Sequence, residues 1–135
     1  MKITLRQAAL AMGVMNELGE QVLDGAVSKA IHTNKIVLRD HADFLIHEET
    51  KLIRAYGAVQ TENGLNVPDN PEKNDEFCQK MRSVQQMTVE VNPAHIDEDT
   101  LVRTAKFRSV DLDHIDFITH KEKYADNGEK ESEKK

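Results

Sequence analysis

Asn34, His41 and Glu48 are polar residues spaced seven apart in a stretch whose other seam positions are apolar. On a helix this spacing places them on one face, about 10.5 Å apart along the axis, so each needs a partner from another element. A histidine facing a carboxylate across an interface would form a proton-linked switch or a polar pocket. The structural alternative is that these residues set the register of paired helices, as an isolated asparagine does in coiled coils.

Basic side chains in the same stretch form a second candidate site. Five of them are distributed around the predicted helix, as is typical of a solvated face: Lys29, Lys35, Arg39, Lys51 and Arg54. The candidate ligand-binding residues are His32, Lys35, Arg39 and His47. A subunit interface that brought them together would hold an anion, such as the phosphate of a nucleotide. The sequence therefore carries a ligand-binding hypothesis, in which an anionic nucleotide is sequestered between subunits.

Acidic residues gather near the C-terminal end of the apolar part of the chain, around His114. Oxygen-rich groupings of this kind can hold a hard cation. Helical spacing lets Asp113 and Asp116 share a face but directs Asp111 and His114 elsewhere. Acidic residues are also favoured at the start of a helix by its dipole. We therefore expect a helix start here and no metal site.

Cys78 is the only cysteine, which excludes an intrachain disulfide and fits a reducing compartment such as the cytoplasm. Its neighbours Phe77 and Gln79 and its place in a predicted helix favour a buried spectator over a nucleophile. The sequence contains no glycine-rich phosphate loop, nucleophile elbow or aromatic RNA platform. We expect a cytoplasmic protein that is not an enzyme and needs no cofactor.

The composition argues against two classes of partner. The chain of 135 residues carries a formal net charge of −6, which repels the phosphates of a nucleic-acid polymer. No stretch approaches the roughly 18 apolar residues that a membrane-spanning helix requires. Because aromatic residues make up only 4% of the chain, the core must be aliphatic, which favours helices.

A single long helix is predicted from Gly25 to Tyr56, where apolar residues recur at intervals of three and four. Asp24 can cap its start, and Gly57 can end it in the left-handed conformation. Such a helix is about 48 Å long, which is longer than a domain of this size is wide. We therefore expect part of its apolar seam to meet a second copy of the chain or another protein. The predicted interface residues are Val27, Ile31, Asn34, Leu38, His41, Leu45, Glu48 and Leu52.

Shorter elements flank the long helix. Thr4 and Gln7 form a capping box that starts a helix at Leu5, and the pair Asn63-Gly64 suits a tight hairpin turn. A third helix is expected over residues 71–87, with Phe77, Met81, Val84 and Met87 facing inward. The remaining expectations are a strand over 88–91, a helix capped by Asp97 or an irregular segment over 96–109, and a final helix over 109–118 capped by Ser109.

These elements predict a mainly α fold, with a long antiparallel helical hairpin, a short β-hairpin or strand element and a small C-terminal helix. One domain is expected over residues 1–118. Residues 119–135 balance lysines against acidic residues without an apolar core, which predicts a charged flexible tail.

The order of features resembles a family of short, uncharacterised helical proteins encoded in phages and prophages. The shared pattern is a capped leading helix, a long helix with an internal asparagine and a closing Tyr-Gly, a glycine-containing turn, a proline-led third helix, an acidic strand and a short final helix. In this chain the parts are residues 4–22, Asn34 through Tyr56-Gly57, Asn63-Gly64, Pro68 through Phe77, 89–91 and 109–118. The match spans nearly all of the chain except its tail, and Gly13 and Gly19 depart from the pattern.

The resemblance implies a viral setting, where small helical proteins help to build a particle or disable host defence components. The leading hypothesis is a non-catalytic, homo-oligomeric binding protein that acts through the long helix on a host or phage protein, including one of host defence. The alternatives are the sequestration of an anionic nucleotide and a part in virion or tail assembly.

Overall fold

The helix α2 (Gly25–Tyr56) is the longest element of the computed structural model, which describes residues 1–124. Asp24 caps its start by accepting a hydrogen bond from the amide of Ala26 at 3.2 Å. Gly57 ends it with a φ of 63°, a left-handed conformation that glycine adopts without steric cost. Both expected ends of the long helix are confirmed, and the chain is mainly α.

The other elements are shorter. The helices are α1 (Leu5–Gly19), α3 (Pro71–Gln85), α4 (Glu98–Thr104), α5 (Ser109–His114) and α6 (Asp116–Thr119), followed by the 3-10 turn η1 (Lys121–Tyr124). The strands are β1 (Lys2–Thr4), β2 (Val59–Thr61), β3 (Gly64–Asn66) and β4 (Thr88–Glu90). The capping box of Thr4 and Gln7 and the cap of Asn70 on α3 are both present, so local sequence signals place these helix starts correctly.

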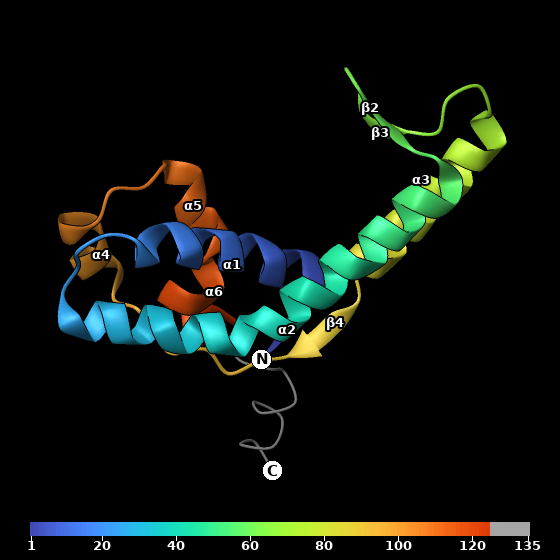
Figure 1. The fold of residues 1–135 in the computed structure, drawn as a ribbon. Helices are drawn as coiled ribbons and strands as arrows, with labels where there is room; N and C mark the ends of the chain where they lie inside the picture. Colours follow the sequence, from blue (N-terminus) through green and yellow to red (C-terminus); the bar gives the residue numbers. More distant parts are fainter. Residues whose placement is uncertain (125–135) are drawn as a thin grey trace, which may run out of the picture.

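Two helices of 15 residues each, α1 and α3, lie end to end along α2 (Figure 1). At their junction the amide of Leu5 donates to the carbonyl of Met87 at 2.8 Å, and Leu5, Leu45 and Val84 pack together. At the far end of α2, Tyr56 contacts Phe77 with ring centroids 5.8 Å apart. Two such helices span about 45 Å, nearly the whole length of α2.

A two-stranded ribbon joins these two helices at their junction. Strand β1, which runs into α1, pairs antiparallel with β4, which follows α3, and Ile3 stands opposite Val89. Residues 88–90 form the predicted strand, but its partner β1 was not expected from the sequence, because three residues carry too short an alternation to identify a strand.

The second ribbon, β2 and β3, is the predicted hairpin. Thr61 stands opposite Gly64, so the turn residues are Glu62 and Asn63, one position earlier than expected. Only Gly64 takes a positive φ here, at 100°. The left-handed angle therefore falls on glycine alone, and Asn63 does not need it.

We call residues 1–45 and 86–124 the body and residues 46–85 the arm. In the body, α1 covers the first half of α2, and the segment from β4 to η1 adds a further layer (Figure 1). The body core is continuous and includes Ile3, Met15, Leu18, Ile31, Leu38, Ile96, Leu101, Ile115, Phe117 and Ile118.

Two side-chain amides, one on α2 and one in the loop between α1 and α2, fasten the C-terminal segment to the rest of the body. Asn34 donates to the carbonyl of Ala94 at 2.9 Å and accepts from its amide at 2.7 Å. Gln21 does the same with Lys106, at 2.6 Å and 2.8 Å. Each amide therefore satisfies both backbone groups of one loop residue, as a neighbouring strand would.

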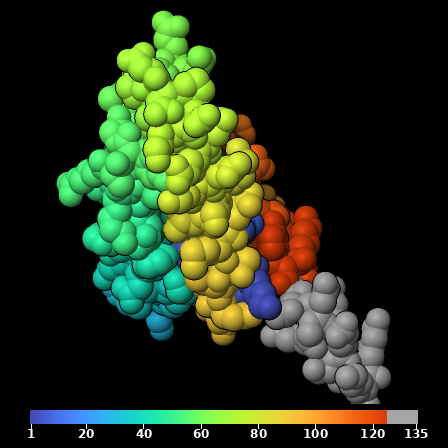
Figure 2. Space-filling view, turned by 90° about the vertical axis from the view of Figure 1, so that its right-hand side faces the viewer, coloured from blue at the N-terminus to red at the C-terminus, as the bar shows by residue number. Residues whose placement is uncertain are grey.

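The arm consists of the second part of α2, α3 and the β2–β3 hairpin, and it projects from the body (Figure 1). In Figure 2 the molecule is elongated, and the arm forms its upper end, coloured green to yellow-green. No residue of α2 beyond Leu45 is buried among the described residues, and α3 buries only Phe77 and Val84. Met81 is half-buried and Met87 is 49% exposed, so the predicted inward face of α3 is correct at two of its four positions.

The C-terminal part of the fold departs from expectation in two ways. The predicted final helix is broken at Ile115 into α5 and α6, and its N-cap position is Arg108, whose amide is bound by Asp111 at 3.0 Å. The folded domain also continues past residue 118, because Thr119 is buried and Tyr124 packs on Phe117 with centroids 6.3 Å apart. The predicted tail therefore begins too early, and residues 125–135 lie outside the described residues.

Only the first part of the segment 96–109 forms the helix α4, and Asp97 caps it by accepting from the amide of Thr100 at 3.0 Å. Residues 105–108 are irregular. No helix within residues 1–124 has the length and apolar character needed to cross a membrane.

Candidate binding site at the tip of the arm

The apolar seam of α2 is mostly enclosed within one chain. Five of the predicted interface residues are at most 5% exposed: Val27, Ile31, Asn34, Leu38 and Leu45. The expectation that the chain could not cover its own long helix is therefore wrong for this part of the seam. The physical reason is that α1 and α3 lie end to end, so their combined length matches that of α2. Leu52, in the arm, is half-buried.

The polar members of the seam differ in their surroundings within one chain. Asn34 finds its partner in the backbone of Ala94. Glu48 is half-buried and pairs with Lys51 on the same helix at 2.8 Å, and no ion pair joins it to His41 among the described residues. Asn34 is thus a structural residue, whereas the pairing of His41 with Glu48 across an interface between chains stays a prediction.

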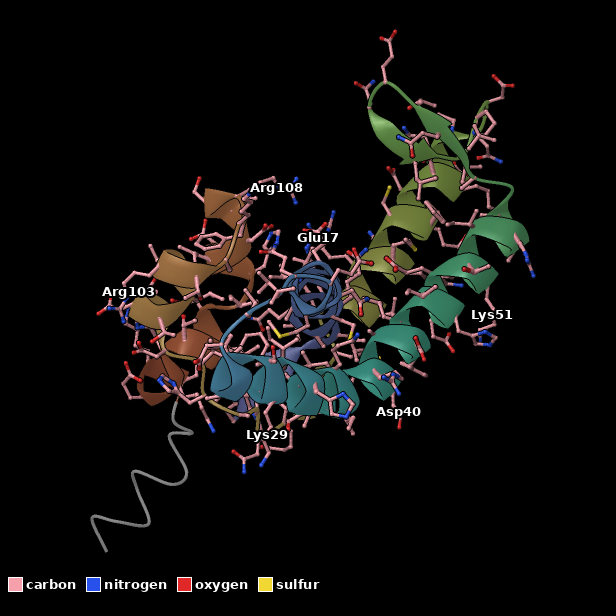
Figure 3. The ribbon with its side chains drawn as sticks, turned by 60° about the vertical axis from the view of Figure 1, so that its left-hand side comes forward. Glu17, Lys29, Asp40, Lys51, Arg103 and Arg108 are labelled. Carbon is pink, nitrogen blue, oxygen red and sulfur yellow. The ribbon has the colours of Figure 1, made fainter. Side chains whose placement is uncertain are left out.

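The four predicted nucleotide-binding residues all lie on α2. His32, Arg39 and His47 are exposed on α2, and the ammonium of Lys35 lies beside Gly19 at the end of α1. Arg39 and His47 are eight residues apart, which is about 12 Å along the helix. Figure 3 shows Lys29 and Asp40 on the side of the same helix that faces away from α1. Anion binding between subunits by these residues stays a prediction.

The acidic residues around His114 have separate structural partners. Asp111 is buried and accepts from the guanidinium of Arg108 at 3.2 Å, whereas Asp116 accepts from the hydroxyl of Tyr124 at 2.8 Å. No group of three or more histidine, cysteine, aspartate or glutamate side chains in the described part of the chain is arranged to hold a metal ion. Cys78 is a free, half-buried thiol on α3.

A polar cluster at the C-terminal end of the body was missed in the sequence. The Nε2 atom of His120 lies 3.0 Å from Glu98 of α4 and 3.9 Å from Asp116, and its Nδ1 atom lies 3.7 Å from Glu122. Burial, followed by the hydrogen bond to Asp116, raises the pKa of Tyr124 to about 12. The cluster fastens η1 to α4 and α6. Assigning residues 119–135 to a tail hid it, although the spacing of Asp116 and His120 is that of one helical turn.

The arm tip holds a pocket of about 610 Å³ between α2, the loop after β3 and the start of α3. Its lining residues are Leu52, Ala55, Tyr56, Val67, Pro68, Asn70, Lys73 and Lys80. The capping of α3 by Asn70 and the proline at its first position bring the start of this helix to the end of α2. A hydrogen bond of 2.8 Å from the amide of Val67 to Asn74 then holds the connecting loop against α3.

Two lysines of the pocket flank Tyr56. The ammonium of Lys73 lies 6.0 Å and that of Lys80 5.4 Å from the centre of its ring. The same ammoniums reach different oxygens of Glu76, at 3.3 Å and 3.5 Å. The hydroxyl of Tyr56 and the ammonium of Lys73 lower the pKa of Glu76, and contacts with Tyr56 and Glu76 raise the pKa of Lys80. The two ammoniums and the carboxylate of Glu76 therefore form one charged cluster beside the ring of Tyr56.

This arrangement can bind an anionic group that is attached to an apolar group. The apolar wall can take a hydrophobic side chain, and the two ammoniums can meet a negative charge. Sequence reasoning missed this site because its residues come from three separate segments. A signal was present in the spacing of Lys73, Glu76 and Lys80, which places all three on one face of a helix.

No family model, curated protein or solved structure matches this chain. The resemblance to phage-encoded helical proteins therefore stays a prediction from the pattern of the sequence.

Proposed function

We propose that the protein is a non-catalytic binding protein that contacts a partner protein through the arm. The observation that carries the proposal is the change in burial along α2. The seam is enclosed up to Leu45, whereas Leu52 and Tyr56 are only half-covered. An apolar edge that its own chain leaves partly exposed gains free energy when a second surface covers it.

The choice of partner draws on the resemblance described above. A phage-encoded protein of this type would bind a host or phage protein, including a component of host defence. Most of the seam residues from which self-association was predicted are buried within one chain. The proposal therefore uses the arm and does not require a second copy of the chain. Self-association is tested separately by light scattering of the purified protein.

Site-specific photo-crosslinking tests the proposal. A photoreactive residue is placed in the arm at Ile46 or Val59 and, as a matched control, in the body at Val102 or Val110. All four side chains are apolar and between 43% and 57% exposed, so the four variants differ in region and not in accessibility. Each variant is exposed to lysate of host cells with and without phage infection.

The proposal expects the two arm positions to crosslink to the same protein, identified by mass spectrometry, and the body positions to give no such product. Excess unmodified protein should compete the product away. Crosslinks of equal yield from the body positions, or different products from the two arm positions, would contradict the proposal.

A further inference from the structure

The pocket at the arm tip has charges of one sign in its lining. Its charged members are Lys73 and Lys80, and none of the described residues that line it is a carboxylate, although the whole chain has a net charge of −6. The remaining lining is apolar except for Asn70 and the hydroxyl of Tyr56. The pocket is therefore suited to a ligand that is both anionic and apolar.

The structure contains a carboxylate that shows which kind of group these two ammoniums bind. Glu76, on the same helix, is bracketed by both ammoniums, one on each of its oxygens. The ring of Tyr56 lies beneath the same two charges. Glu76 therefore occupies the position on these ammoniums that a carboxylate of a ligand would take, so a ligand has to replace it or join it.

We propose that the pocket binds an acidic segment of the partner protein, with a bulky apolar side chain against Leu52, Val67 and Pro68 and a carboxylate at Lys73 and Lys80. This inference rests on the proposed function and names the chemistry of its contact. The pocket is open to solvent. That shape suits a segment of a protein chain better than a small molecule, which is usually enclosed over most of its surface.

Two substitutions are expected to change binding in opposite directions. The double substitution Lys73→Gln with Lys80→Gln removes both charges and should weaken binding about tenfold. Glu76→Gln removes the internal carboxylate that competes for the same ammoniums, so binding should become tighter. A purely structural role of this cluster would instead lower binding in both variants.

The experiment is an amide chemical-shift titration of the full chain with three probes. The first is a blocked pentapeptide with Glu-Phe-Glu at its centre, the second is its Gln-Phe-Gln analogue, and the third is phenyl phosphate. The control variant is Lys51→Gln, which removes a lysine of the same arm that pairs with Glu48 and does not line the pocket (Figure 3). Circular dichroism verifies that all variants fold.

We expect the acidic peptide to shift the amides of Tyr56, Val67 and Lys73 in the wild type and in Lys51→Gln, more weakly in the double lysine variant and more tightly in Glu76→Gln. Equal shifts with the neutral peptide, or no shift at millimolar peptide, would overturn the inference. Saturable shifts with phenyl phosphate alone would overturn it in favour of a small anion. If the arm crosslinks persist in any of these cases, the proposed function stands and only the pocket assignment fails.

Discussion

The body and the arm share one helix but bury it to different depths. Leu38 and Leu52 stand on the same seam of α2, two heptads apart, yet Leu38 is fully buried and Leu52 is half-buried. In the body, α1 and the segment from β4 to η1 both contribute to the core that encloses the seam. In the arm, α3 lies over the seam, and Leu52 packs at the edge of the small cluster of Leu5, Leu45 and Val84. A regular apolar seam is thus buried only as deeply as the layers over it allow.

The largest expected effect is a difference in stability between the same leucine-to-alanine substitution made in the body and in the arm. Leu38→Ala should lower the free energy of unfolding by about 3 kcal/mol, because it opens a cavity in the body core, whereas Leu52→Ala should cost about 1 kcal/mol. Urea denaturation followed by circular dichroism measures both. Equal costs would show that the arm is packed as tightly as the body.

A second prediction compares two side-chain amides that make the same pair of hydrogen bonds. Asn34 is 0% exposed, whereas the hydrogen bonds of Gln21 are exposed to solvent. Asn34→Ala should therefore cost about 2 kcal/mol, since water cannot replace the buried bonds, and Gln21→Ala about 0.5 kcal/mol. The same denaturation experiment applies. A small effect at Asn34 would mean that the loop at Ala94 finds other partners.

Two glycine substitutions should change stability in opposite directions. Gly57→Ala, at the end of α2 in the arm, should cost about 1 kcal/mol because alanine is strained at a φ of 63°. Gly13→Ala, within α1 in the body, should add about 0.5 kcal/mol through helix propensity, because nothing lies within 4 Å of the new methyl group. Thermal unfolding of the two variants side by side gives the signs. A destabilising Gly13→Ala would show that space in α1 is tighter than the structure has it.

The smallest expected effect concerns the two tyrosines, one in each region. Because the pKa of Tyr124 is raised to about 12, this residue contributes stability in full below its unfolded pKa of about 10, and the contribution is lost as the pH rises from about 10 to 12. Absorbance titration of a Tyr56→Phe variant isolates Tyr124 and should give one transition near 12. Asp116→Asn should lower this pKa only partly, since burial is its largest cause. A midpoint at the ordinary tyrosine value would contradict the packing of η1.

Features that depend on neighbours within a few residues were predicted well. Thr4 with Gln7, Asp24, Gly57 and Asn70 each satisfy or shape a helix end through groups two to four residues away, or through their own backbone angle. The same reasoning placed the cap of α4 at Asp97. It failed at residue 109, because Asp111 binds the amide of Arg108 and moves the start of α5.

Features that depend on distant segments were not predictable from one sequence. The strand β1 needs β4, which lies more than 80 residues away, and His120 pairs with Glu98, which lies 22 residues earlier in the chain. The pocket at the arm tip combines α2, α3 and the loop between them. No local periodicity in the sequence predicts such tertiary contacts, because they depend on the free energy of the whole packed core.

The amino-acid sequence by itself determined the long helix, its caps and the seam along it, since these follow from backbone hydrogen bonding and from apolar periodicity within a few turns. Only the tertiary structure decided what covers that seam. Two short helices laid end to end bury it in the body and leave it half-covered in the arm, because burial depends on how many layers meet at a position and not on the pattern of the helix that carries it.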